Sequence, residues 1–178
     1  VVAETAGGHV RARQAVLAGN AYLGPIGAGI EREELRYAVP VASSVLVTEP
    51  LGAERAAALI PSGAAVCDMN HLLSYYRLTP DGRLLFGGRA SAANGQPAAA
   101  LAALRRSLLR TFPALAGAGV AYRWRGTVAL TRNRFPRFGR LERDIYFAHG
   151  YSGQGVALSG LAGRLIAEAV AGTAERFD

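Results

Sequence analysis

The chain contains 178 residues, of which 51% are hydrophobic, and it carries a formal net charge of +7. This content supports one or two domains with a hydrophobic core and argues against intrinsic disorder. No apolar run reaches the ~18 residues that a membrane-spanning helix requires, so we expect no membrane association. Cys67 is the single cysteine, which excludes an internal disulfide and fits a reducing cytoplasm.

All 20 basic residues are arginine, and the chain has no lysine. Arginine in place of lysine, together with 22 glycines, indicates the coding bias of a GC-rich genome. The arginines are scattered, and the densest groups are Arg105–Arg106 and the pair Arg132 and Arg134. A non-catalytic basic module that binds nucleic acid or a protein partner is therefore a disfavoured alternative.

The first part of the chain predicts a hairpin, two strands and a helix. Gly7–Gly8 forms the turn of a hairpin within residues 1–13. The apolar residues 15–18 predict a buried strand, and the β-branched residues 39–48 predict a longer strand. A helix follows over residues 53–60.

The middle of the chain carries the clearest turn signal. Residues 72–78 and 83–88 flank Thr-Pro-Asp-Gly at residues 79–82, where the proline and the Asp-Gly pair favour a tight turn. Residues 97–112 place large apolar side chains at helical spacing, and a proline suits the first helical turn. A β-hairpin followed by a helix is therefore predicted.

The last part predicts a strand over residues 120–131, a turn over residues 134–139, a strand over residues 144–148 and a helix over residues 156–171. The antiparallel middle thus stands between strand-plus-helix pieces. This order predicts an α/β (α+β) fold in which one domain is inserted between two parts of another.

The most informative segment joins the last predicted strand to the last helix. Residues 149–156, His-Gly-Tyr-Ser-Gly-Gln-Gly-Val, form a glycine-rich elbow before a helix. A helix N-terminus presents free N–H groups and a partial positive charge, and glycines let an electron-rich ligand approach the backbone. The elbow predicts one end of a cofactor site whose other end lies elsewhere.

An ordered set of motifs then carries a resemblance to a known family. The motifs are AVLAGNAY at residues 15–22, YYRLT at 75–79, DGRLLFGGR at 81–89, WRG at 124–126 with Thr131 and Pro136, and HGYSGQGV at 149–156. The chain resembles the C-terminal half of a flavoprotein of the D-amino-acid oxidase superfamily, in particular its gamma-glutamylputrescine oxidase-like members.

The resemblance implies FAD as the cofactor and half of an FAD site in this chain. Residues 1–30 and 123–178 correspond to parts of a Rossmann-like FAD-binding domain, and residues 31–122 to part of an inserted substrate-binding domain with a mixed or antiparallel sheet. In this family the G-x-G-x-x-G loop that holds the FAD pyrophosphate lies near the N-terminus. The chain has no such motif before a helix, so we interpret it as a fragment that needs the missing N-terminal half and is inactive alone.

By resemblance, the elbow lies under the pyrimidine end of the flavin ring, where the helix dipole favours the negative charge of the reduced ring. The residues that the resemblance assigns to FAD are Val2, Ala18, Gly19, Arg125, Gly126, Gly150, Tyr151, Ser152, Gly153, Gln154, Gly155 and Val156. Gly126 stands about where sarcosine-oxidase relatives carry the cysteine that tethers their flavin, so we expect noncovalent FAD. An ordinary helix start is the alternative interpretation of the elbow.

The resemblance also implies oxidation of the C–N bond of an amine, such as a gamma-glutamylputrescine-like substrate, by hydride transfer to flavin N5. Val128 stands about where amino-acid oxidases place an arginine that pairs with the substrate carboxylate, which favours an amine without that group. Pairing by Arg77, Arg89 or Arg132 instead is the alternative. An oxidase or dehydrogenase acting on glycine, sarcosine or proline is the alternative. No catalytic residue is assigned; the candidates for the substrate pocket are Tyr75, Arg77, Arg89 and Trp124, with aromatic packing as the alternative for Tyr75 and Trp124.

Histidine is the side chain best suited to act as acid or base near neutral pH, so His71 and His149 are candidates for this role, but hydride transfer from a neutral amine requires no strong protein base and demands neither. His9 is expected on the surface of a strand. No His, Cys, Asp or Glu group has the spacing of a metal site. Some relatives place a lysine near flavin N5 for the reaction with dioxygen, and this segment supplies none.

Overall fold

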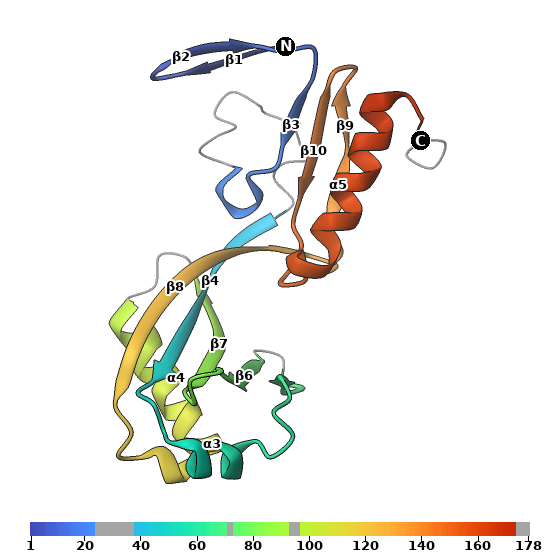
Figure 1. The fold of residues 1–178 in the computed structure, drawn as a ribbon. Coiled ribbons are helices and arrows are strands. Elements are labelled where there is room, and N and C mark those ends of the chain that lie inside the picture. The colour runs from blue at the N-terminus through green and yellow to red at the C-terminus, as the bar shows by residue number, and fades with distance from the viewer. Residues whose placement is uncertain (24–37, 71–72, 93–96, 174–178) are drawn as a thin grey trace. The chain divides into compact units, whose positions relative to one another are not determined.

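The computed structural model describes residues 1–23, 38–70, 73–92 and 97–173, without the side chains of residues 89–92. The chain divides into two compact units (Figure 1). The first unit combines Val1–Pro40 with Val128–Asp178, and the second unit is Val41–Thr127. The second unit therefore interrupts the first one along the sequence.

The first unit contains a hairpin and a three-stranded sheet. β1 (Val2–Thr5) and β2 (Gly8–Arg11) pair antiparallel about the predicted glycine turn. β3 (Ala15–Leu17) runs parallel to β10 (Ile145–His149), and β9 (Arg137–Glu142) pairs antiparallel along the other edge of β10. β10 is the central strand, and its side chains are buried from Tyr146 onward.

The helix α5 (Gly155–Ala171) packs against β10 and completes the core of this unit (Figure 1). Tyr146 and Ala148 point to the same face of the strand because side chains alternate along it. They form a buried cluster with residues of α5, namely Ala162, Ile166 and Ala169. Two of these three helix residues are alanine, which lets α5 approach the strand closely. The elbow between β10 and α5 is thus held by packed elements on both sides.

The second unit is built on a five-stranded sheet in the order β5-β6-β7-β4-β8. Its strands are β4 (Ala38–Thr48), β5 (Val66–Cys67), β6 (Ser74–Leu78), β7 (Leu84–Ala92) and β8 (Val120–Thr131). β4 pairs antiparallel with β7, and β6 pairs antiparallel with both β5 and β7. The antiparallel arrangement expected for the middle of the chain is confirmed.

The predicted tight turn joins β6 to β7. The Gly82 N–H donates to the Thr79 carbonyl at 2.9 Å, and the Thr79 N–H donates to the Arg83 carbonyl at 2.9 Å. The Thr79 hydroxyl donates to Asp81 at 2.6 Å, and Arg83 donates to the same carboxylate at 2.6 Å. These two hydrogen bonds lower the pKa of Asp81 and fix the tip of the hairpin.

The helix α4 (Pro97–Thr111) covers one face of this sheet, and its Leu104 and Leu108 enter the core. Phe86 is fully buried there, and the ring of Tyr76 stacks on it with 5.5 Å between ring centroids. α3 (Ala53–Leu59) and the short helix η2 (Pro113–Leu115) add Leu59 and Leu115 to the same cluster. In the described ranges, none of the helices has both the length and the apolar character needed to cross a bilayer.

Two expectations about the first unit are wrong. Residues 134–139 were expected to form a turn, but β9 begins at Arg137 and pairs with β10 as far as Glu142. The error arises because this strand is half exposed and carries charged side chains, which hide its alternating pattern. Val16 was expected to be buried, but it is 47% exposed because β3 has a single described partner strand.

Candidate functional site

The elbow between β10 and α5 has an unusual backbone. Gly150, Ser152 and Gly153 all adopt positive φ angles, of 73°, 52° and 96°. Side chains other than that of glycine rarely adopt such angles, so the left-handed Ser152 needs contacts that hold it there. The glycine-rich elbow was predicted from the sequence. The left-handed conformation of Ser152 between the glycines is seen only in the structure.

Gly150 sits where no side chain fits. A Cβ atom at this position would lie 2.4 Å from Cγ2 of Thr131, far inside van der Waals contact. The Gly150 N–H donates to Oδ1 of Asn20 at 3.0 Å, although the two residues are 130 positions apart in the sequence. Asn20 itself has a φ angle of 46° and begins the short helix η1 (Asn20–Tyr22). The start of the elbow is therefore tied to the chain that leaves β3.

Ser152 ties the elbow to the end of β8. Its N–H donates to the Ala129 carbonyl at 3.0 Å, and its Oγ accepts from the Thr131 N–H at 3.1 Å. The Thr131 hydroxyl donates to the Phe135 carbonyl at 2.8 Å and also lies 3.1 Å from Ser152 Oγ. The single Ser152 hydroxyl hydrogen has two acceptors within reach, the Gly150 carbonyl at 3.2 Å and Thr131 Oγ1 at 3.1 Å.

The N-terminus of α5 is open. Gln154 occupies the N-cap position without a side-chain hydrogen bond to the helix, and Val156 in the first turn is fully exposed. Gly153 is exposed too, and no atom lies within 4 Å of the place where its Cβ would stand. Within the described residues, these groups fit an electron-rich ring or phosphate approaching the first N–H groups of the helix.

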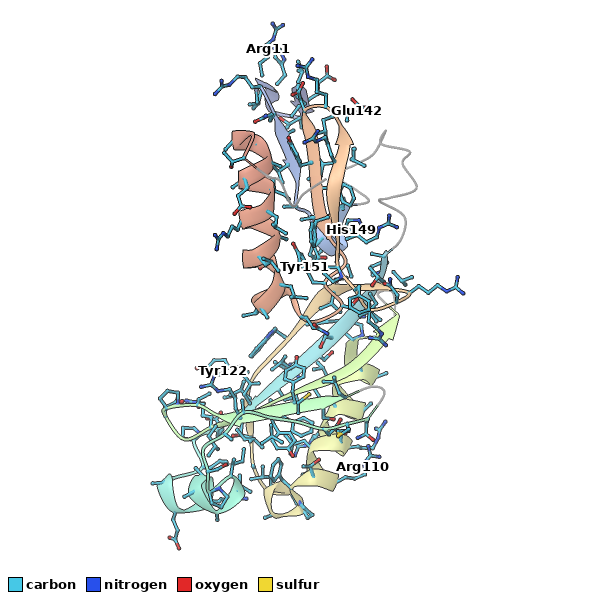
Figure 2. The ribbon with its side chains drawn as sticks, turned by 90° about the vertical axis from the view of Figure 1, so that its right-hand side faces the viewer. Arg11, Arg110, Tyr122, Glu142, His149 and Tyr151 are labelled. Atoms are coloured by element: carbon cyan, nitrogen blue, oxygen red, sulfur yellow. The ribbon has the colours of Figure 1, made fainter. Side chains whose placement is uncertain are left out.

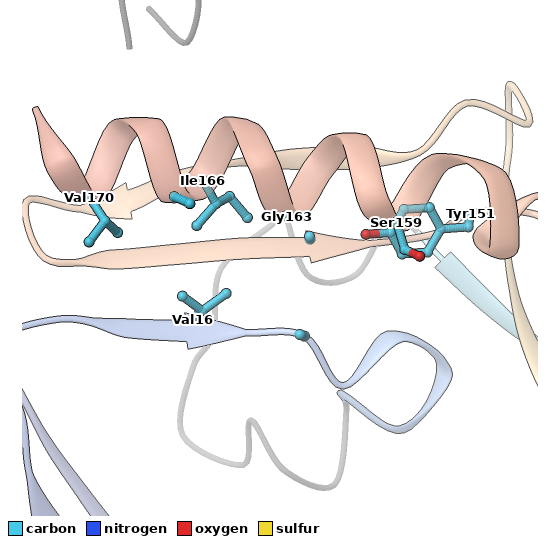
Figure 3. Close-up of a pocket in the computed structure, with 9 residues that line it drawn as sticks. Val16, Tyr151, Ser159, Gly163, Ile166 and Val170 are labelled. Atoms are coloured by element: carbon cyan, nitrogen blue, oxygen red, sulfur yellow. The ribbon is translucent and has the colours of Figure 1, made fainter. Parts of the chain in front are cut away.

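A cavity of about 420 Å³ lies beside the elbow, between β3, β10 and α5 (Figure 3). Val16 faces it from the strand side, and Gly163, Ile166 and Val170 face it from the helix (Figure 3). Ala18 and Tyr151 line the same cavity, so the structure brings two of the FAD candidates together. Partial burial raises the pKa of the Tyr151 hydroxyl, which stays neutral in these surroundings.

The remaining FAD candidates are placed as follows. Gly19 precedes η1 and accepts a hydrogen bond from the Tyr22 N–H at 2.9 Å. Val2 lies on β1 and is 54% exposed. Arg125 and Gly126 lie on β8, where a Cβ at Gly126 would meet nothing within 4 Å. Gly155 opens α5, with its Cβ position 3.6 Å from Cβ of Tyr151.

Tyr75 lies on the face of the second unit's sheet opposite the α4 core. It pairs with Gly87 across β6 and β7, and a Cβ at Gly87 would stand 2.2 Å from the Tyr75 ring. The missing side chain of Gly87 thus makes room for this ring. The Tyr75 hydroxyl lies 3.4 Å from that of Ser43, while Tyr76 points into the core. The neighbouring tyrosines therefore point to opposite faces of the sheet, as the alternation of side chains along a strand requires.

The other pocket candidates differ in exposure. Arg77 is exposed, and its Nε donates to the neighbouring Leu78 carbonyl at 3.3 Å. Trp124 is 48% exposed on β8 and is therefore not the core aromatic of the alternative interpretation. Arg89 belongs to β7, but its side chain lies outside the described ones.

The described histidines differ in how far they are exposed to solvent. His149 is 1% exposed at the end of β10, beside the elbow that carries Tyr151 (Figure 2). Its ring lies 5.6 Å from that of Phe147. His9 is exposed on β2, as expected, and His71 lies outside the described residues. The described part of the chain holds no cluster of three or more His, Cys, Asp or Glu residues that suits a metal ion.

Sequence reasoning placed Asn20 and Thr131 in the right motifs but assigned no function to their side chains. Both side chains act over long sequence separations, of 130 and 21 residues. One signal was available for Asn20, because asparagine after glycine favours the left-handed conformation that it adopts here. No local pattern pointed to Thr131.

Residues 1–169 match the family model described as DAO, FAD dependent oxidoreductase. Over 177 residues the chain is 46% identical to the gamma-glutamylputrescine oxidoreductase of Escherichia coli strain K12, covering 99% of this chain and 41% of that protein. A probable oxidoreductase, OrdL, of Haemophilus influenzae is 44% identical, covering 99% of this chain and 40% of its own length. The chain thus spans about two fifths of these relatives.

Solved structures share the same fold. L-proline dehydrogenase from P. horikoshii matches with a TM-score of 0.79 and 22% identity, covering 99% of this chain and 47% of that one. Glycine oxidase from Geobacillus kaustophilus matches with a TM-score of 0.79 and 23% identity, covering 99% and 46%. The mixed α/β fold expected from the sequence is confirmed.

Proposed function

The chain belongs to the DAO family of FAD-dependent oxidoreductases, and from this premise we propose that it supplies the flavin-ring end of an FAD site in an amine-oxidising enzyme. FAD is the family's cofactor. The first unit, Val1–Pro40 with Val128–Asp178, is the FAD-binding part of the proposal, and the second unit is the substrate-binding part. The rest of the FAD site, including the loop for the pyrophosphate, comes from a further segment of the same protein.

The observation that carries the proposal is the open elbow at the N-terminus of α5. The helix has no side-chain cap, Gly153 leaves free space, and the flanking Gly150 and Ser152 hold the backbone in a fixed, left-handed course. A partial positive charge at this terminus stabilises negative charge on a ring that approaches it. The candidates Tyr151, Gln154, Gly155 and Val156 belong to the same terminus and complete this contact surface.

Bound FAD would supply the acceptor for a hydride from the carbon next to the amine nitrogen, and loss of that hydride would convert the neutral amine into an iminium ion. The nitrogen loses a proton, and water then hydrolyses the imine to a carbonyl compound and a free amine or ammonia. The protein's contribution is to orient a neutral amine and to favour electron-rich flavin by the charge at α5. No strong protein base is needed, because the amine reacts in its neutral form and the iminium N–H is acidic enough to pass its proton to water.

We propose an amine without a carboxylate at its reacting end, such as a gamma-glutamylated diamine, as the substrate. The identity of 46% to the gamma-glutamylputrescine oxidoreductase supports this class. The half-buried, aliphatic Val128 offers no charge for a substrate carboxylate. Noncovalent FAD belongs to the same proposal, since Gly126 has no side chain to form a bond. We retain the reducing cytoplasm as the expected location.

An absorbance titration of the purified full-length protein tests this function. We expect a flavin band that bleaches without oxygen when gamma-glutamylated amines are added, and FAD that is released intact on acid denaturation. Bleaching by glycine, sarcosine or proline alone would instead support the amino-acid alternative. A full-length protein that never holds flavin would contradict both the amine-oxidising and the amino-acid-oxidising function. An oxygen-uptake measurement with the same amines tests whether dioxygen is the electron acceptor.

Tyr75 provides a separate test of the substrate-binding part. We expect Tyr75→Phe to raise the KM for the amine about fivefold, because it removes one hydroxyl worth about 1 kcal/mol while the ring stays over Gly87. The flavin spectrum should not change. Tyr122→Phe is the matched control, since Tyr122 is 59% exposed on β8 and its ring contact with Arg83 survives the change. Equal KM values in all three proteins would assign Tyr75 to packing alone.

A further inference from the structure

Two side chains outside the elbow determine its course. Gly150 is fixed by Asn20, which accepts the hydrogen bond from its N–H at 3.0 Å. Ser152 is fixed by Thr131, whose N–H and hydroxyl both lie 3.1 Å from Ser152 Oγ. Two residues of one elbow are thus attached to two different chain segments, the end of β3 and the end of β8.

These attachments are partly buried, and the Thr131 side chain is the most enclosed part of them. Thr131 is 4% exposed, and its methyl group lies where a side chain at position 150 would stand. Its hydroxyl donates to the Phe135 carbonyl at 2.8 Å and lies 3.1 Å from Ser152 Oγ. The Thr131 hydroxyl therefore contacts two polar groups, the Phe135 carbonyl and the Ser152 hydroxyl, and its removal would lose both contacts.

We propose that Thr131 and Asn20 are positioning residues for flavin, which act by holding the elbow so that the N-terminus of α5 keeps its place at the ring. This rests on the proposed function. Ser152 is held at a φ angle of 52°, which costs energy without these partners. Loss of either attachment lets the elbow relax, and a displacement of about 1 Å at a reacting group can reduce a rate ~100-fold.

The test compares two threonine-to-valine changes in the FAD-loaded, full-length protein. Thr131→Val keeps the shape but removes the hydroxyl that joins Ser152 to Phe135. We expect about tenfold weaker FAD binding, a changed visible circular dichroism spectrum of the bound flavin, and slower bleaching by amine. Thr131→Ser, which keeps the hydroxyl, should restore all three measurements toward the wild-type values.

Thr48→Val is the matched control. Thr48 is 2% exposed, and its Oγ1 accepts from the Leu84 N–H at 2.9 Å in the second unit. It should lower the thermal unfolding midpoint as Thr131→Val does, but leave FAD affinity and the flavin spectrum unchanged. If both variants lose thermal stability and neither changes the flavin measurements, the positioning role is wrong.

Asn20 keeps the proposal testable if Thr131→Val fails to fold. Asn20→Leu removes the acceptor for Gly150, whereas Asn20→Asp retains an oxygen in the same place. We expect Asn20→Leu to weaken FAD binding and to change the spectrum of the bound flavin. Asn20→Asp should keep both close to the wild-type values. Equal values in both would overturn the role of Asn20. A wild-type protein without FAD, by contrast, would contradict the proposed function itself.

Discussion

Replacing Gly153 with tryptophan should abolish FAD binding while the protein remains folded. Gly153 is exposed before α5, and no atom lies within 4 Å of its Cβ position, so an indole has room in the absence of a ligand. In the proposed site this same space is taken by the flavin ring. The φ angle of 96° adds a strain of about 1–2 kcal/mol, too little to unfold a domain. The measurement is the FAD content and the FAD dissociation constant of the purified full-length protein.

The opposite end of the same helix provides the control. Gly172 follows α5 with a φ angle of 73°, is exposed, and also has no atom within 4 Å of its Cβ position. Gly172→Trp therefore introduces the same side chain with a similar backbone strain, and it should leave FAD binding intact. Gly153→Ala carries the strain without the bulk and should bind FAD nearly normally. Full FAD content in Gly153→Trp would show that the elbow is not at the ring.

The parts of the fold that follow from local chemistry were predicted well. The Thr-Pro-Asp-Gly turn at residues 79–82 forms as expected because its hydrogen bonds lie within the turn itself. The helix expected over residues 97–112 is α4, Pro97–Thr111, since its leucines face a core at regular spacing. The family and its cofactor were also predicted, because several short motifs recur in one order, and both are confirmed.

The parts that depend on distant partners were not predictable. β9 forms because β10 lies beside it, and its own residues, such as Arg140 and Glu142, carry no strong strand signal. The exposure of Val16 depends on the number of neighbours that β3 has. The hydrogen bond from Gly150 to Asn20 closes a separation of 130 residues, which no local pattern reveals.

The same distinction applies to the candidate site. The elbow was predicted because three glycines and a helix start are a local pattern with a direct physical meaning. What holds the elbow was missed, because it comes from the ends of β3 and β8. The sequence therefore predicted a glycine-rich elbow before a helix, which the structure confirms, whereas the contacts that hold this elbow required the structure. That FAD binds at the elbow stays a prediction.

The second large effect is expected in the second unit, Val41–Thr127, which we propose as the substrate-binding part. Phe86→Ala should reduce the free energy of unfolding of this unit by about 3–5 kcal/mol. Phe86 is fully buried, its ring stacks on Tyr76 at 5.5 Å, and Tyr76 in turn meets Phe112 edge-on at 5.1 Å. Removing the ring leaves a cavity that this aromatic row cannot fill. Since domains are stable by about 5–15 kcal/mol, such a loss takes a large part of the total.

Hydrogen–deuterium exchange of peptides from β6 and β7 measures this loss directly, and thermal unfolding gives a second value. Phe135→Ala is the control, because Phe135 is 70% exposed and its contact with Thr131 uses the backbone carbonyl. It should change neither measurement appreciably. Phe86 neighbours Gly87 but points to the other face of the sheet, away from Tyr75. At temperatures where Phe86→Ala stays folded, the KM for the amine should therefore remain near that of the wild type. A large rise in KM without faster exchange would show that the two faces of this sheet are coupled, contrary to the separation of core and pocket proposed for them.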